Sequence, residues 1–286
     1  MFFLFITASS YAQLPKEIRK IYKDKIDVRV SDEFDGNGKV DLSKWNYRQT
    51  KPNGIATGEN FVRKVNGNLV CYGWKKEKKA GGIVAKMQTH FGFIDTKFKV
   101  SGIVNSQQTV WHPSIWSGQC NGQTDATKEC LKTGGNWLEI DMMEFENTPT
   151  VRWSSDAPAR LKVSELKKSV KVNDVNGRKL GYEKAVMIKK VTEGFHEWKR
   201  LGLEYHPEYL QLWEVIDHEW LKLGRRIIFD NKKPTIGSIP KACATPMFWY
   251  IGNLFNPYKN QKFVEEEVTN STLEVDYFRF YPIKNE

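Results

Sequence analysis

The sequence is short of cysteine and of long apolar runs, and each shortage disfavours a class of protein. Four cysteines among 286 residues are too few for the disulfide scaffold of a small secreted domain. No two of them have the short spacing of a structural zinc site. No apolar run reaches the roughly 18 residues that a membrane-spanning helix needs. With 40% hydrophobic residues, the composition indicates a globular chain that can bury a sizeable core.

Nucleic-acid-binding motifs are also missing, although the chain is basic. Lys and Arg number 44 against 34 Asp and Glu, which gives a net charge of +10. That balance favours an anionic partner, such as nucleic acid, membrane headgroups or an acidic polysaccharide. No helix-turn-helix, zinc or arginine-rich pattern accompanies the charge. We therefore expect no nucleic-acid partner and no membrane partner, and an anionic polysaccharide remains.

The N-terminus predicts export. Residues 1–12 are apolar and end in Ser10-Tyr11-Ala12, with small residues where a signal peptidase cuts. The usual cationic start is missing, and no cysteine follows to hold a lipid anchor. We expect a signal peptide over 1–12, a lead-in over 13–25 and one domain over 26–286, in a monomer that is secreted or periplasmic.

The pattern beyond the lead-in is that of an all-β protein. A short helix is expected over 15–24. Alternation of apolar and polar residues over 94–100 and 201–215 predicts half-buried strands. His206-Pro207-Glu208 turns the second run into a hairpin, and 272–281 forms a closing strand. Many short strands with Gly, Asn and Pro turns favour a two-sheet sandwich. The segment 160–190 has helix-like spacing and is expected to be an excursion beside the cleft.

The cysteines allow one local bridge. Cys120 and Cys130 bracket a polar loop and form a candidate disulfide, whereas Cys71 and Cys243 are expected to be buried thiols.

Three acids stand close together in the run from Trp137 to Phe145. Glu139 and Asp141 share one face of an extended strand, but strict alternation puts Met143 on that face in place of Glu144. A β-bulge, one extra residue in the strand, would return Glu144 to the face of the other two. We therefore predict a bulged strand with three carboxyls along one side.

Crowded carboxylates resist ionising together, so such a strand needs a chemical task. Retaining glycoside hydrolysis supplies one, because one carboxylate attacks the anomeric carbon while a second, protonated group serves the leaving oxygen. Asp141, between the two glutamates, would hydrogen-bond Glu139 and separate their pKa values.

The run Glu139-Ile-Asp-Met-Met-Glu144 resembles the bulged Glu-x-Asp-x-x-Glu signature of glycoside hydrolase family 16. Further segments resemble the family in its order along the chain; they are 32–36 with Trp45, 82–86, 91–97, 111–116, 195–198 and 275–281. The resemblance implies an all-β, concanavalin-A-like jelly roll with an open concave substrate cleft. It also implies an endo-acting, retaining hydrolase that needs no cofactor for catalysis.

The same resemblance assigns residues. It implies Glu139 as nucleophile, Asp141 as assisting carboxylate and Glu144 as acid/base, with Trp116 and Trp137 as cleft aromatics. It places Trp45, Trp198 and Trp213 in the core. Some members bind a structural calcium, for which the candidates here are Glu33, Gly36 and Asp276, although turn and sheet structure is the favoured role.

The bulged branch includes laminarinases and the marine galactanases, namely agarases, porphyranases, kappa-carrageenases and furcellaranases. The charge of +10 favours the second group, because their substrates carry sulfate esters that cationic side chains bind. Candidate substrate-binding residues are Arg48, Lys51, Arg63, Arg152, Arg160, Trp74 and Trp153. Each of these cations taken alone is more simply a surface charge. A laminarinase, a lectin-like sandwich that binds glycans without cutting them, and a transglycosylase are the alternatives.

Overall fold

The computed structural model describes residues 13–48, 60–102, 110–118, 139–144, 162–164, 197–230, 238–241, 244–255 and 270–284. Within these ranges the chain is built almost wholly of strands, with one helix, α1 (Lys16–Ile21). The described part holds no helix that is long and apolar enough to cross a bilayer.

The smaller of the two sheets has six strands, all paired antiparallel. Its order is β1-β5-β14-β7-β8-β9. The strands span Trp45–Tyr47 (β1), Gly82–Ala85 (β5), Phe248–Gly252 (β14), Ser114–Gly118 (β7), Glu139–Glu144 (β8) and Lys162–Ser164 (β9). The strand that carries the three acids, β8, therefore lies between β7 and β9.

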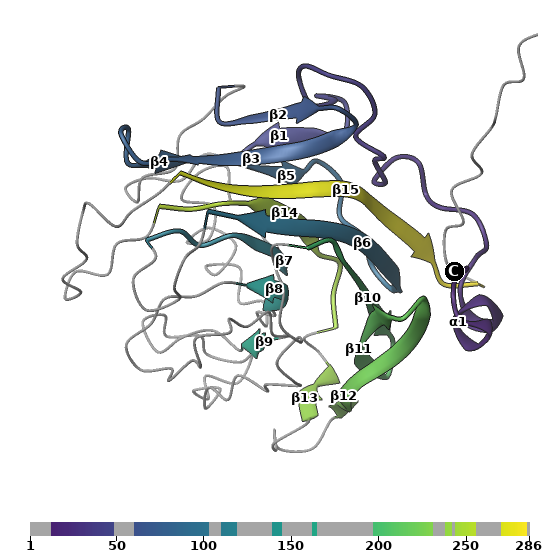
Figure 1. Cartoon of the computed structure of the whole chain (residues 1–286). Helices are drawn as coiled ribbons and strands as arrows, with labels where there is room; N and C mark the ends of the chain where they lie inside the picture. Colours follow the sequence, from purple (N-terminus) through teal and green to yellow (C-terminus); the bar gives the residue numbers. More distant parts are fainter. Residues whose placement is uncertain are drawn as a thin grey trace, which may run out of the picture.

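The larger sheet has nine strands, in the order β13-β12-β11-β10-β6-β15-β3-β2, with β4 paired to β3. The bounds are Val62–Val65 (β2), Asn68–Trp74 (β3), Lys79–Ala80 (β4), Gly92–Ser101 (β6), Lys199–His206 (β10), Tyr209–Ile216 (β11), Glu219–Asp230 (β12), Ser238–Pro240 (β13) and Ser271–Pro282 (β15). Its pairs are antiparallel except β12 with β13. The closing strand β15 lies in the middle of the sheet, beside β6 and β3, so the last strand of the sequence pairs with two strands from the first half of the sequence (Figure 1).

The hydrophobic core is formed by side chains from both sheets. Trp249 and Ile251 of the six-stranded sheet share one buried cluster with Ile94, Phe98 and Leu203 of the nine-stranded sheet. Side chains alternate between the faces of a strand, so each sheet gives one face to this cluster. The predicted two-sheet β-sandwich is confirmed (Figure 1).

Several predicted elements are confirmed and two are corrected. The hairpin pairs His206 with Tyr209, and Cys71 is a buried free thiol. The helix is shorter than expected and stops at Ile21, because Tyr22 takes an extended conformation and bridges Ile283. Residues 162–164, expected within a helix-like segment, form β9. The signal peptide, Cys120, Cys130 and Cys243 lie outside the described residues.

The lead-in packs against the nine-stranded sheet. Leu14, Ile18 and Tyr22 form a second cluster with Phe93 and Trp213. Within this cluster the buried carboxylate of Glu204 accepts hydrogen bonds from the Tyr209 hydroxyl at 2.7 Å and from Tyr22 and Trp213 at 3.4 Å. The lead-in is thus held by both apolar burial and a buried polar centre.

Of three tryptophans assigned to the core, one is exposed. Trp45 and Trp213 are buried, as expected, but Trp198 keeps 37% of its surface exposed. The ammonium groups of Lys97 and Lys99 lie 5.0 and 5.1 Å from its ring centroid. The cation–π contacts hold the ring on the outer face of the sheet, so its assignment to the core was wrong.

We predict that Tyr209→Phe lowers the free energy of unfolding by about 1.5–3 kcal/mol, because it removes a short hydrogen bond to a buried carboxylate. Urea denaturation measures the change. Tyr72→Phe is the control, since the Tyr72 hydroxyl only accepts a 3.4 Å hydrogen bond from Arg63 at the surface, and it should cost less than about 0.5 kcal/mol. Equal losses in the two variants would contradict a structural role for Glu204.

Candidate active site

The acidic strand contains the predicted bulge. Along the β7–β8 pairing, Gly118 faces Glu139 and Trp116 faces Asp141, but the next pair is Ile115 with Met143, and Ser114 then faces Glu144. Met142 is the extra residue. Because Ser114, Trp116 and Gly118 alternate along β7, they share one face, and their three acidic partners take positions on that same face.

The opposite face of β8 explains why the bulge forms. Ile140, Met142 and Met143 are all fully buried in the core between the sheets. A regular strand cannot bury two consecutive residues on one side, since its side chains alternate. The bulge allows both methionines to pack inward, and it leaves positions 139, 141 and 144 on the face away from the core.

Two aromatic side chains lie on the face of the sheet beside Asp141. Asp141 is only 1% exposed, and its cross-strand partner Trp116 stacks on Tyr250 of β14 with 3.9 Å between ring centroids and 9° between planes. Tyr250 was not singled out from the sequence. Its position after the buried Trp249 was a usable signal, because alternation places Tyr250 on the other face of β14.

A cation lies over the same aromatic pair. The Arg48 guanidinium is 5.1 Å from the Trp116 ring centroid and 5.4 Å from that of Tyr250, and the residue is 9% exposed. Its backbone N–H donates to the carbonyl of Gly82 at 2.8 Å, which ties the segment after β1 to β5. Of the two candidate cations within the described ranges, Arg48 and Arg63, the structure brings Arg48 to the neighbours of the acidic strand.

The row of residues that crosses the sheet to Glu144 consists of two glycines and a serine, so it carries almost no side-chain atoms. Gly82, Gly252 and Ser114 are aligned across β5, β14 and β7 and lead to Glu144. A Cβ at Gly82 would lie 2.9 Å from the Gly252 Cα, so this close approach of the strands requires glycine. The row through Asp141, with Trp116 and Tyr250, therefore lies beside a row through Glu144 that is mostly backbone.

The acidic strand has a neighbour on its other side. β9 pairs Ser164 with Glu139 and Lys162 with Asp141. Three residues are too few to show a strand period, so only the pairing in space reveals β9.

Other predicted binding residues do not join this group. Trp74 stacks on Tyr72 with 5.2 Å between ring centroids, and Arg63 lies 5.3 Å from the Tyr72 ring. These residues belong to β2 and β3 of the nine-stranded sheet, so the structure does not bring Trp74 or Arg63 to β8. Outside the described residues lie Trp137, Arg152, Trp153, Lys51 and Arg160.

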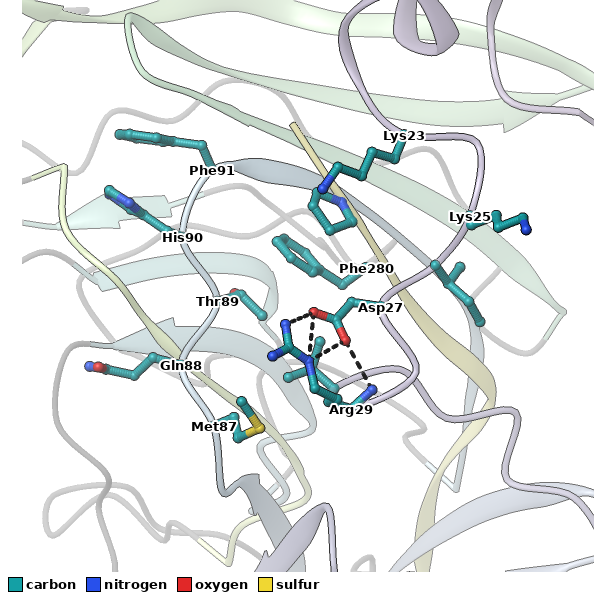
Figure 2. Close-up of a pocket in the computed structure, with 13 residues that line it drawn as sticks. Lys23, Lys25, Asp27, Arg29, Met87, Gln88, Thr89, His90, Phe91 and Phe280 are labelled. Atoms are coloured by element: carbon teal, nitrogen blue, oxygen red, sulfur yellow. Dashed lines mark hydrogen bonds and ion pairs between the residues drawn. The ribbon is translucent and has the colours of Figure 1, made fainter. Parts of the chain in front are cut away.

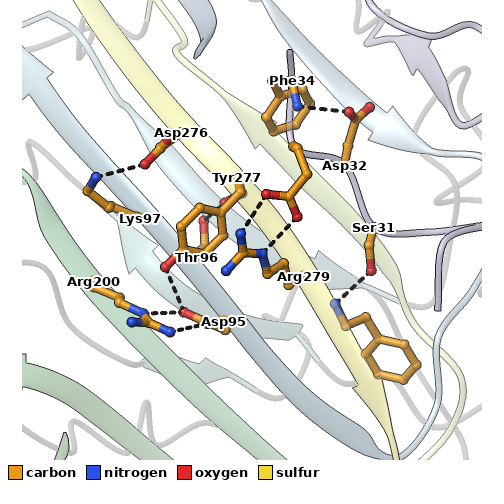
Figure 3. Close-up of polar contacts among 12 residues, drawn as sticks. Ser31, Asp32, Phe34, Asp95, Thr96, Lys97, Arg200, Asp276, Tyr277 and Arg279 are labelled. Atoms are coloured by element: carbon orange, nitrogen blue, oxygen red, sulfur yellow. Dashed lines mark hydrogen bonds and ion pairs between the residues drawn. The ribbon is translucent and has the colours of Figure 1, made fainter. Parts of the chain in front are cut away.

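The candidate calcium ligands do not fit a metal ion. Glu33 accepts two hydrogen bonds from Arg279, at 2.7 and 2.6 Å, and Asp276 accepts one from Lys97 at 2.7 Å. Figure 3 shows the Asp276 carboxylate turned toward Lys97. Gly36 has φ of +78°, the conformation of a turn glycine. Across the described ranges no group of three or more His, Cys, Asp or Glu could hold a metal. Turn and sheet structure is the role that remains.

Comparison with known proteins gives the fold. No protein-family model and no curated protein sequence matches the chain. Solved structures do match. SCLam, a non-specific endo-β-1,3(4)-glucanase from family GH16, is 17% identical, with 90% of this chain and 92% of that chain covered and a TM-score of 0.58. The chain has the same fold as SCLam. That fold is the jelly-roll β-sandwich.

Two further matches differ in what they are described to do. Porphyranase B from Zobellia galactanivorans is 14% identical, with 91% of this chain and 92% of that chain covered and a TM-score of 0.54. Rv0315 of Mycobacterium tuberculosis, an immunostimulatory antigen and pseudo-β-1,3-glucanase, is 16% identical, with 88% and 97% covered and a TM-score of 0.60. One fold thus carries different activities, so the fold alone does not determine the reaction.

We predict that Arg48→Met lowers the free energy of unfolding by about 1–2 kcal/mol, because desolvated cation–π contacts are lost. Arg63→Met removes a contact of similar length made by an exposed arginine and should cost less than about 1 kcal/mol. Urea denaturation of the two variants checks the difference. A more stable Arg48→Met protein would show that burial of the guanidinium costs more than its aromatic contacts return.

Proposed function

We propose that the protein is a secreted, retaining endo-β-glycosidase, with Glu139 as the nucleophile and Glu144 as the general acid/base. The observation that carries the proposal is the bulged register of β8, which gives three acids adjoining positions on the face away from the core. A glycan-binding protein does not need this crowding, which is costly for carboxylates without a task.

The proposed reaction proceeds in two displacements. The Glu139 carboxylate attacks the anomeric carbon and forms a glycosyl ester, while the Glu144 carboxyl gives its proton to the departing oxygen. A water molecule then attacks the anomeric carbon, Glu144 takes the proton of that water, and the ester to Glu139 breaks. The two inversions return the sugar to its original configuration.

The backbone spacing sets a requirement on the side chains. Positions 139 and 144 face Gly118 and Ser114, four residues apart on β7, which corresponds to roughly 13 Å at the rise of a strand. Retention needs carboxyls about 5–5.5 Å apart, so both glutamates must lean toward each other. Asp141, buried midway on the same face, would accept or donate a hydrogen bond to Glu139 and help separate the two pKa values.

We predict that Glu139→Gln lowers kcat by more than about 10³-fold and that Glu144→Gln lowers it by about 10²–10⁴-fold, with unfolding free energies close to wild type. A reducing-sugar assay and circular dichroism measure the two effects. Glu208→Gln, a change at an exposed turn, is the matched control and should leave kcat unchanged.

Azide separates the two roles on an aryl glycoside. With Glu139→Gly it should give the glycosyl azide of inverted configuration, and with Glu144→Gly the retained one, because azide replaces the missing nucleophile in one case and the second-step water in the other. Near wild-type turnover in either glutamine variant would refute the assignment.

We further propose a sulfated red-algal galactan, of agar, porphyran or carrageenan type, as the substrate. The net charge of +10 and the Arg48 cation over the Trp116–Tyr250 pair support an anionic ligand beside the acidic strand. The fold is shared with a porphyranase.

A laminarinase is the second candidate. A neutral β-1,3-glucan would use the stacked Trp116 and Tyr250 as a platform for sugar rings and would not need the charge of Arg48. The similarity to SCLam favours this reading as strongly as porphyranase B favours the first. A transglycosylase would use the same two carboxylates. A sandwich that binds glycans without cutting them is a further alternative, and the similarity to the pseudo-β-1,3-glucanase Rv0315 favours it.

We predict that the protein cleaves at least one of porphyran, agarose and the kappa-, iota- or furcellaran-type carrageenans. Arg48→Met should lower kcat/KM on the sulfated substrate by about 10- to 100-fold, as loss of a charge-assisted hydrogen bond would. Activity on that substrate should fall with added salt, since exposed charges are screened over about 8–10 Å at physiological ionic strength. If the protein cleaved only laminarin, the proposed galactan substrate would be wrong and β-1,3-glucan would be the substrate.

A further inference from the structure

A cavity lies away from the acidic strand. It has a volume of 430 Å³ and forms where the loop after α1, residues 23–30, passes the connection from β5 to β6, residues 87–91, at the end of β15. Figure 2 shows the two segments on opposite sides with Phe280 between them. The volume is within the range of small-ligand pockets, and none of the lining residues belongs to β7 or β8.

The charged groups of this cavity are mainly cationic. Lys23, Lys25 and Arg29 line it against one carboxylate, Asp27. Arg29 donates through Nε at 2.9 Å and Nη2 at 2.5 Å to Asp27, and these hydrogen bonds hold the pKa of the Asp27 carboxyl below its ordinary value. The pair is self-neutralising, so the exposed ammonium groups of Lys23 and Lys25 set the sign of the cavity.

The same cavity has an apolar wall. Met87 lines it with 41% of its surface exposed, and the Phe280 ring lies between the two segments (Figure 2). An exposed thioether packs readily on irregular apolar surfaces, and the Phe280 ring adds an aromatic surface. The amide of Gln88 also lines the cavity and donates to the Pro246 carbonyl at 3.3 Å.

We propose that this cavity is an accessory binding site for an anionic sugar unit of a polysaccharide. A pyranose with a sulfate or carboxylate substituent has an apolar C–H face for Met87 and Phe280, hydroxyls for the polar rim, and a negative group for Lys23 and Lys25. The choice of an anionic glycan rests on the proposed function. A chain held here is bound without being cut, so the site would keep the enzyme on its polymer.

The test follows the ¹³C-labelled methyl group of Met87 by NMR in a Glu139→Gln background, which prevents cleavage. The probe is a kappa-carrageenan tetrasaccharide, and its desulfated form is the comparison. We expect the Met87 methyl signal, assigned with Met87→Leu, to shift with the sulfated probe, and the dissociation constant to be at least about fivefold weaker for the desulfated one.

Lys23→Gln/Lys25→Gln should weaken binding at Met87 by at least about fivefold. Lys76→Gln/Lys79→Gln is the matched control, because it makes the same charge change at two exposed lysines around β4 that do not line the cavity. An unmoved Met87 signal, or equal weakening by both double variants, would overturn the proposal.

The outcome is separable from that of the proposed function. A shift at Met87 in a protein that cleaves no polysaccharide would support the binding site and refute the hydrolase. Cleavage of a galactan without a shift at Met87 would do the reverse.

Discussion

The candidate site depends on one conflict in β8, between the alternation of a strand and the burial of two consecutive methionines. Met142 and Met143 are both completely buried in the core, where each large apolar side chain contributes roughly 1.5–3 kcal/mol. A bulge costs local hydrogen bonding, but it keeps both side chains inside. The same extra residue returns position 144 to the face of 139 and 141. Packing of the core and alignment of the acids are therefore a single structural event.

The outer face of the six-stranded sheet is arranged in strips that differ in chemistry. The strip through Asp141 carries Trp116 and Tyr250, with the Arg48 guanidinium above them. The strip through Glu144 is made of Gly82, Gly252 and Ser114. The two strips adjoin on this face, and the buried Arg48 guanidinium adds a positive charge beside Asp141. Both strips come from strands distant in sequence.

The nine-stranded sheet supports this arrangement from the other side. Its outward face carries ion pairs between neighbouring strands, such as Arg200 with Asp95 at 2.6 Å (Figure 3). The lead-in is fastened to it by the cluster around Glu204. The Asp95 side chain is completely buried and that of Arg200 is 11% exposed, so this pair is shielded from solvent, unlike an ion pair at the surface. Other cationic side chains lie at the surface, among them Lys23 and Lys25 at the cavity.

Sequence patterns alone determined the all-β class, the β10–β11 hairpin and the strands over 94–100 and 272–281, because these follow from the local pattern of apolar and turn residues. The bulge in β8 was predicted from the break in that alternation between Asp141 and Glu144. Only the tertiary structure decided which residues meet across strands. It placed Arg48 on Trp116 and Tyr250, left Trp198 exposed under two lysines, and engaged Glu33 and Asp276 with Arg279 and Lys97. It also removed Trp74 from the acidic strand, since β3 belongs to the other sheet. Periodicity fixes the face on which a residue lies, whereas the neighbours on that face come from strand order, which depends on contacts between residues far apart in the chain.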